Sequence, residues 1–287
     1  MEPTSVVLAD LQVVYYIKVA FLTLLVYDTL LQINEEYNHV WKSRWTLIKC
    51  LYLWTRYSTF VGASIPLVHA AYAGPVVCDG VTTFTTIFST LGIGVTEMIL
   101  MIRTYTLYER SKKLLAFFFA LWFSLGGIAF WAVTTWSSRF SSSNSLPVES
   151  CYVTNSSGIG IGLVSYLVLL VGETTIVLLT LYKVFRKFSY REIGFLRSMY
   201  CDGVWFYLAI LPFTIATVVC LFAAPFSGLN DTPVQVMHSI LCCRLITHAR
   251  NVAAEEDRRE DAIKKVFKSQ YMPLSNAVVD IGPPDKV

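Results

Sequence analysis

Residues 159–182 read IGIGLVSYLVLLVGETTIVLLTLY, an apolar block in which Glu173 is the one acidic or basic side chain. A helix needs roughly 20 such residues to cross a hydrocarbon core about 30 Å thick, because each residue adds about 1.5 Å along the helix axis. The block is therefore long enough for one membrane crossing. A soluble protein would have to bury such a helix on every side.

Similar apolar blocks recur along the chain, and together they predict seven transmembrane helices. Hydrophobic residues make up 55% of the 287 residues and charged residues 15%, whereas ordinary soluble domains carry about 25% charged residues. The chain offers no set of polar-faced helices that could cover these blocks in water. We therefore expect an all-α, polytopic membrane bundle whose spans cover approximately residues 13–33, 47–67, 81–102, 114–135, 159–182, 203–224 and 232–248.

The connections between the blocks alternate in basic content, which predicts the orientation. The inner connections hold eleven Lys and Arg, whereas the outer segments hold one, Arg139. The inner connections are residues 34–46, 103–113 and 183–202, and the outer segments are residues 1–12, 68–80, 136–158 and 225–231. Cytosolic loops carry the excess of Lys and Arg in membrane proteins, so we expect the N-terminus outside and the C-terminus inside. The same rule accounts for the net charge of +3, which gives no reason to expect nucleic-acid binding.

The predicted outer segments contain two features of secretory-pathway proteins. Cys78 precedes the third span and Cys151 follows the fourth, so a disulfide on the oxidising side would hold the loop over the third helix. The alternative is two unpaired thiols. Asn155-Ser156-Ser157 is an N-glycosylation sequon in the longest outer loop. The expected location is the plasma membrane or another membrane of the secretory pathway.

Five ionisable side chains fall well inside the predicted spans: the acids Asp28, Glu97 and Glu173, and the bases Arg56 and Arg244. Ionisable groups in spans are costly, and they mark function, paired partners or water-filled cavities. Because these five lie on five different helices, we predict one buried ionic network in which the arginines pair with the acids. The network either fixes helix register and packing alone, or forms a switch or a proton or ion path.

Several enzyme classes lack their motifs. The histidines are His39 in an inner loop, His69 at an outer end, His238 in the outer half of its span and His248 at an inner end, so they do not converge on one metal. The last span, 232–248, contains no Lys for a retinal Schiff base, and nucleophile-elbow, P-loop and dinucleotide motifs are absent from the sequence. We therefore expect no enzymatic activity, no metal and no cofactor.

The tail, residues 249–287, contains an acidic and basic segment, Glu255–Asp261, near its start and ends in a Pro- and Asp-containing stretch. Ile263, Val266 and Phe267 would share one face of a helix, which favours a short helix on the membrane surface. A solvated charged helix is the alternative. Beyond Tyr271 the composition is typical of a disordered end.

A recurring set of residues resembles a known fungal family. The set comprises Tyr27-Asp28, Glu36, Trp41, Trp45, Lys49, Leu51-Tyr52-Leu53, Arg56-Tyr57, Arg103-Thr104-Tyr105-Thr106-Leu107-Tyr108, Asp202-Gly203, His238-Ser239 and Arg244. It resembles a large group of basidiomycete seven-helix membrane proteins that carry an N-terminal domain of unknown function. Thr55 and Thr106 depart from the pattern, which has Asn and Ala there. The resemblance implies no established activity, and it implies that Asp28, Arg56 and Arg244 belong to a shared framework.

Three functions remain open, and the favoured one is a receptor-like sensor. It would bind a small extracellular ligand and contact a cytosolic signalling partner through its basic inner loops. Arg103-Thr104-Tyr105 ends the third span where rhodopsin-type receptors carry an acid-Arg-Tyr switch, although no acid precedes Arg103 here and the seventh span lacks Asn-Pro-x-x-Tyr. The alternatives are a structural or scaffolding membrane protein and a transporter that uses the buried ionic network.

Overall fold

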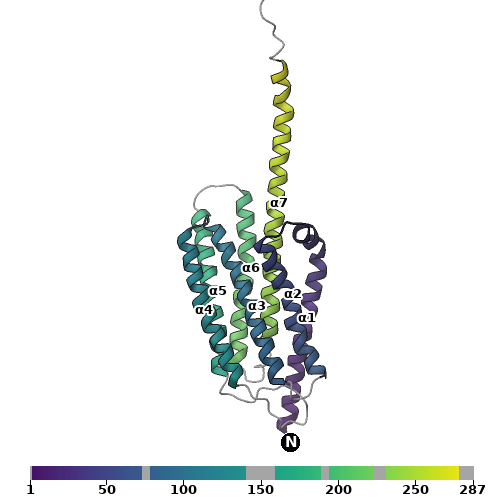
Figure 1. Ribbon diagram of the computed structural model, residues 1–287, viewed down its shortest axis with the longest axis vertical. Coiled ribbons are helices and arrows are strands. Elements are labelled where there is room, and N and C mark those ends of the chain that lie inside the picture. The colour runs from purple at the N-terminus through teal and green to yellow at the C-terminus, as the bar shows by residue number, and fades with distance from the viewer. Residues whose placement is uncertain (1, 73–77, 140–158, 189–193, 223–230, 278–287) are drawn as a thin grey trace, which may run out of the picture.

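The computed structural model describes residues 2–72, 78–139, 159–188, 194–222 and 231–277, and every regular element in these ranges is a helix (Figure 1). The α-helices are α1 (Glu2–Glu36), α2 (Leu47–Tyr72), α3 (Cys78–Leu107), α4 (Lys112–Arg139), α5 (Ile159–Phe188), α6 (Gly194–Phe222) and α7 (Asp231–Ala277). A short π-helix, η1 (Tyr37–Trp41), follows α1. The predicted Cys78–Cys151 disulfide and the Asn155 sequon lie outside the residues whose side chains the structure describes.

Each predicted span falls on a different α-helix, although residues 223–224 of the sixth lie outside the described ranges. Four of the described helical segments are long and apolar enough to cross a membrane: Gln12–Trp41, Gly80–Leu107, Lys112–Trp136 and Ile161–Arg186. The apolar part of α6, Trp205–Cys220, is shorter. The chain therefore has the helices of a membrane protein.

The polarity of the bundle is reversed relative to a soluble protein. Phe119, Phe123 and Trp131 of α4 are exposed, as are large apolar side chains on the other helices. By contrast, Thr55 and Arg56 of α2 are buried. A surface of this kind suits lipid, which solvates apolar side chains, while polar groups find partners inside the bundle.

Two helices, α3 and α7, lie at the centre of the arrangement. α7 packs against α1, α2, α3 and α6, while α3 packs against α2, α4, α5 and α7 (Figure 1). From Thr232 to Thr247 most side chains of α7 are buried, and several are polar. This part of α7 is therefore internal, and its buried polar side chains face other helices rather than lipid.

α7 also begins inside the bundle rather than at its end. The Oγ of Ser89 donates a hydrogen bond of 2.9 Å to Oε1 of Gln235. Ser89 lies eleven residues into α3, whereas Gln235 lies four residues into α7. At about 1.5 Å per residue, α7 therefore starts roughly 10 Å deeper than α3.

At its other end α7 leaves the bundle and continues as one helix to Ala277 (Figure 1). It passes Tyr271, beyond which the sequence predicted disorder. Ile263, Val266 and Phe267 are all exposed on this projecting part. The start of the tail is therefore helical, as both alternatives for it require.

Candidate functional site

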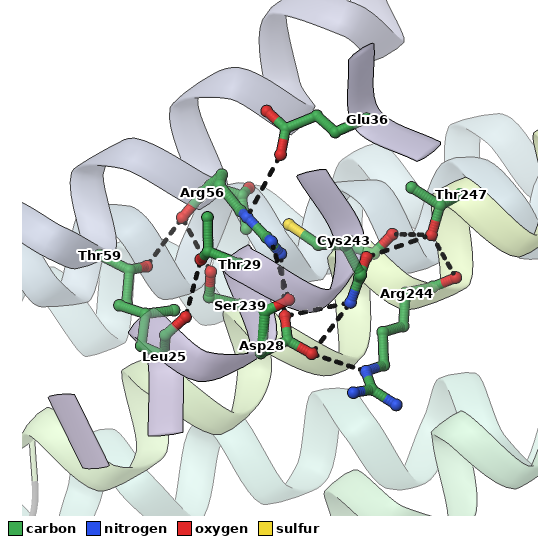
Figure 2. Close-up of polar contacts among 12 residues, drawn as sticks. Leu25, Asp28, Thr29, Glu36, Arg56, Thr59, Ser239, Cys243, Arg244 and Thr247 are labelled. Atoms are coloured by element: carbon green, nitrogen blue, oxygen red, sulfur yellow. Dashed lines mark hydrogen bonds and ion pairs between the residues drawn. The ribbon is translucent and has the colours of Figure 1, made fainter. Parts of the chain in front are cut away.

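The first buried cluster joins α1, α2 and α7 through Asp28, Glu36, Arg56 and Arg244, and we call it the ion cluster. Nη1 of Arg56 lies 3.0 Å from Oδ2 of Asp28, and Nε of Arg56 lies 3.7 Å from Oε2 of Glu36. Nε of Arg244 lies 2.7 Å from Oδ1 of Asp28. Asp28 therefore bridges two guanidinium groups (Figure 2). With all four groups ionised, the ion cluster carries no net charge.

The two arginines differ in exposure. The side chain of Arg56 is 0% exposed and that of Asp28 is 2% exposed, whereas that of Arg244 is 46% exposed. Figure 2 shows the terminal nitrogens of Arg244 directed away from Asp28. A buried charge depends on its partners, because leaving it unpaired in the interior costs several kcal/mol. Arg56 is thus the arginine whose charge most requires the ion cluster.

Uncharged donors complete the coordination of both acids in the ion cluster. Nε2 of Gln32 donates to both carboxylate oxygens of Asp28, at 2.9 and 3.1 Å. The hydroxyl of Tyr57 and the indole of Trp41 both donate to Oε1 of Glu36, at 3.0 and 3.2 Å. Hydrogen bonds to ionised carboxylates are the stronger kind, so these donors add to the contacts that hold each acid in place.

The second buried cluster contains Glu97 of α3, Glu173 of α5 and His238 of α7, and we call it the acid–imidazole cluster. Nε2 of His238 lies 2.9 Å from Oε1 of Glu173, and Nδ1 lies 3.9 Å from Oε1 of Glu97. The hydroxyl of Thr214 on α6 donates to Oε1 of Glu173 at 2.8 Å. One buried imidazole therefore lies between two buried carboxyl groups.

Several polar atoms of the acid–imidazole cluster lack hydrogen bonds. Both carboxylate oxygens of Glu97 and Oε2 of Glu173 have no hydrogen-bond partner. Neither ring nitrogen of His238 forms a hydrogen bond of good geometry, despite the short approach of Nε2 to Glu173. Buried polar groups are nearly always paired, so a cluster with this many open positions is where a ligand or an exchangeable proton would bind.

Comparison with known proteins bears on the ion cluster. Residues 16–61 match a family of unknown function, DUF6533. The matched segment comprises most of α1, η1 and the first part of α2, and it supplies Asp28, Glu36 and Arg56. No curated protein and no solved structure matches the chain. The ion cluster is thus built mainly within the matched segment, and Arg244 joins it from outside.

The structure corrects the prediction of a single network. It brings Asp28, Arg56 and Arg244 together, as expected, and adds Glu36 of the matched segment. Glu97 and Glu173 lie with His238 instead of with the arginines. The prediction placed the acids by depth alone, whereas pairing also depends on which face of a helix carries each side chain. Glu97 and Glu173 lie on the faces of α3 and α5 that approach His238.

The sequence placed His238 too far from the two glutamates. Counted from the expected start of its span, His238 fell in the outer half, whereas Glu97 and Glu173 fell in the inner half. Because α7 begins inside the bundle, His238 reaches the glutamates from only seven residues into its helix. The expectation of no metal site rested on the depths of the four histidines. One imidazole beside two carboxyl groups on other helices forms no such histidine pattern.

Close contacts on both sides of His238 along the chain hold α7 against α2 and α3. Oε1 of Gln235 accepts the hydrogen bond from Ser89, and a Cβ on Gly62 would lie 2.7 Å from that same oxygen. The hydroxyl of Ser239 donates to the carbonyl oxygen of Thr55 at 3.0 Å. Small residues let helices approach closely in bilayers, and polar side chains then bond across them. The position of α7 between the two clusters is therefore tightly defined.

Proposed function

We propose that the chain is a fungal seven-span membrane protein with its N-terminus outside and its C-terminus in the cytosol. Its location is the plasma membrane or another secretory-pathway membrane. Four of the described helical segments are long and apolar enough to cross a bilayer. α2 and α7 pack among these helices and bury Arg56 and His238 inside the bundle. The uneven distribution of Lys and Arg between the two sets of connections supports the orientation.

The topology is tested by inserting a glycosylation acceptor separately at the N-terminus and after Ala277. Oligosaccharyltransferase acts only on the luminal side, so the N-terminal acceptor should be modified and the C-terminal one should not. An acceptor between Leu107 and Lys112 serves as an internal control and should stay unmodified. Modification of the C-terminal acceptor would contradict an odd number of crossings with the N-terminus outside.

We further propose that this protein acts as a receptor-like sensor with α7 as its output element. The observation that carries the proposal is that α7 contributes Arg244 to the ion cluster and His238 to the acid–imidazole cluster, and then continues unbroken to Ala277. A small extracellular ligand that changes the pairing in either cluster would displace this helix. A cytosolic partner would detect the displacement at the projecting end.

Contacts at the projecting side of the bundle support this role for α7. Nη1 of Arg103 donates to the carbonyl oxygen of Leu245 at 2.7 Å, which ties the end of α3 to α7. Nη1 of Arg250 donates to the carbonyl oxygen of His39 and to the hydroxyl of Ser43. These hydrogen bonds hold α7 in one position. A rotation or shift of α7 would break them and let the same groups bond to other partners. Discrete polar contacts of this kind are what a two-state element requires.

A sensor must populate two positions of α7, and this can be measured directly. Spin labels are placed at Lys112 and Lys268 in full-length protein that lacks reactive native cysteines, and the distance distribution is recorded in lipid nanodiscs. We expect two populations whose ratio changes in Asp28→Asn, because that substitution removes the carboxylate that holds Arg244. Glu255→Gln, a change in the projecting helix, is the control. A single population, unchanged by Asp28→Asn, would favour a scaffolding role.

A transporter is the second candidate, and the open carboxylate oxygens of the acid–imidazole cluster favour it. Buried acids that exchange partners are typical of proton and ion pathways. Purified protein in liposomes distinguishes the two functions, because a transporter moves solute or protons without any partner protein. Flux lost in Glu173→Gln and retained in Glu255→Gln would replace the sensor proposal. No enzymatic activity is proposed.

A further inference from the structure

We propose that Glu97, Glu173 and His238 bind one divalent transition-metal cation, for which Zn²⁺ is the reference ion. Each of the three side chains offers one ligand atom, and these atoms lie within 4.8 Å of one another. They come from α3, α5 and α7, so a bound cation would join three helices that are far apart in the sequence. This inference stands apart from the sensor proposal, because binding is measured on the purified protein without any signalling.

The chemistry of the donors selects the class of cation. One imidazole nitrogen and two carboxylate oxygens form a mixed nitrogen and oxygen set, which Zn²⁺ and its first-row neighbours accept. Mg²⁺ and Ca²⁺ prefer oxygen ligands alone and hold more of them. Three protein ligands would leave a further coordination position open, as in zinc sites that also bind a water or a ligand.

The spacing of the donors fits a common ion. Metal–ligand bonds of about 2.1 Å in tetrahedral geometry place two donors roughly 3.4 Å apart. The Nε2 of His238 lies 2.9 Å from Glu173 Oε1, and its Nδ1 lies 3.9 Å from Glu97 Oε1. Only one ring nitrogen of His238 can bind a given ion, so only one of these two distances applies to the site. The chosen ligand atoms of the three residues all lie within 4.8 Å of one another, and side-chain rotations would bring them to the required spacing.

An independent observation points to a ligand at this place. Both oxygens of Glu97 and Oε2 of Glu173 are buried and have no hydrogen-bond partner. Glu173 uses its other oxygen, Oε1, to accept from Thr214, which leaves Oε2 open. Burying a polar atom without a partner costs about 1–3 kcal/mol, and a charged one costs more. A cation bound to these oxygens would remove that cost.

The acids of the ion cluster are better paired than those of the acid–imidazole cluster. In the ion cluster each buried acid is within reach of a guanidinium and accepts further hydrogen bonds from neutral donors. In the acid–imidazole cluster one imidazole faces two carboxyl groups, so with both carboxyl groups ionised at most one positive charge within the cluster offsets two negative ones. The cluster as a whole therefore attracts a cation, and a divalent ion bound to two carboxylates and a neutral imidazole balances the charge.

The test uses purified full-length protein in detergent, stripped with a chelator and then titrated with Zn²⁺. We expect the unfolding temperature to rise as the metal saturates the protein, because a ligand that binds the folded state stabilises it. Glu97→Gln and His238→Asn each remove one donor and should weaken the affinity by at least about 100-fold, since even outer contacts of metal sites change affinity by 10–100-fold. His39→Asn and Glu255→Gln are matched controls and should keep the wild-type response.

Each outcome decides the proposal. Loss of the response in the two donor variants, with wild-type behaviour in both controls, supports it. Absence of any response in the wild type overturns it, and so does an equal response in all variants, which would place the metal elsewhere. Because a donor variant could fail to fold, Co²⁺ is also added to the wild type. A one-to-one complex whose absorption lacks thiolate charge-transfer bands supports the site, whereas strong thiolate bands would assign the metal to cysteines and overturn it.

Discussion

The Nε of Arg244 donates a 2.7 Å hydrogen bond to Oδ1 of Asp28, although 216 residues separate the two in the sequence. The bond fastens the internal helix α7 to α1, the first helix of the chain. Asp28 also accepts from Arg56 of α2, so one carboxylate holds three helices together. A buried ion pair of this kind adds little net stability, because both charges lose their hydration. Removal of one partner is nevertheless costly, because it leaves the other charge buried without compensation.

The two arginines of the ion cluster should differ in their importance for stability. Arg56→Ala leaves Asp28 and Glu36 without their buried partner and should lower the free energy of unfolding by about 3–5 kcal/mol. Arg244→Ala should cost about 1 kcal/mol, because the side chain is half exposed and such pairs contribute little. Thermal unfolding of the purified variants in one detergent measures both. Equal losses of unfolding free energy in the two variants would show that the contribution of each arginine does not depend on its exposure.

The two glutamates of the acid–imidazole cluster should also respond differently. In the presence of a chelator, Glu97→Gln should leave the unfolding temperature unchanged or raise it, because neither oxygen of Glu97 has a hydrogen bond to lose. Glu173→Gln alters the group that accepts from Thr214 and approaches His238, so it should cost about 1 kcal/mol. Differential scanning fluorimetry compares the variants. A large destabilisation by Glu97→Gln would mean that this acid is a structural partner.

Two glycines on neighbouring helices should differ in their tolerance of a methyl group. A Cβ on Gly62 would lie 2.7 Å from Oε1 of Gln235, whereas one on Gly94 meets nothing within 4 Å. Gly62→Ala must displace the buried Gln235 and break its bond to Ser89, which should cost about 1–3 kcal/mol. Gly94→Ala is the control and should be neutral. In a Gln235→Ala background the cost of Gly62→Ala should disappear, and its persistence there would contradict the assigned clash.

Arg250 should hold the connection between α1 and α2. Its Nη1 donates to the carbonyl oxygen of His39 and to the hydroxyl of Ser43, which lie in and just after η1. Arg250→Gln should therefore speed amide hydrogen exchange across residues 37–46, because local opening becomes easier when few bonds remain. Exchange is measured by mass spectrometry in nanodiscs, with Arg258→Gln in the projecting helix as the comparison. No change at residues 37–46 would assign the order of this connection to other bonds, such as those from Lys49 to the carbonyls of Trp41 and Ser43.

Helix positions followed from the apolar blocks because length and polarity are local properties of the sequence. The block that contains Glu173 lies within α5, and the block that contains Asp28 lies within α1. The sequence also placed Asp28, Arg56 and Arg244 in one network, because ionisable side chains inside spans need partners. The depth of His238 was not foreseeable, because it depends on where α7 starts relative to α3. The local sequence pattern of a helix does not show how far that helix is shifted along its neighbour.

The sequence also did not show which face of each helix points into the bundle. Almost all side chains of a membrane helix are apolar, so its pattern hardly separates a lipid-facing side from a protein-facing one. Glu97 could have turned to the arginines or to His238 without any change in the sequence pattern. The extent of α7 was also underestimated, because the composition after Tyr271 favours disorder when the residues are considered alone. The structure continues α7 as far as Ala277.

The pairing of Asp28 with Arg56 inside one matched segment also bears on how the chain enters the bilayer during synthesis. The first two helices emerge from the ribosome long before Arg244 is made, and a single charge at the centre of a nascent helix raises the cost of insertion by about 2.5–3.5 kcal/mol. In the proposed seven-span topology the two charges neutralise each other within a helical hairpin, so we expect α1 and α2 to leave the translocon as a pair. Nascent chains with Asp28→Asn should therefore release α2 into lipid more slowly, and Arg244 would then be drawn to a carboxylate already in place.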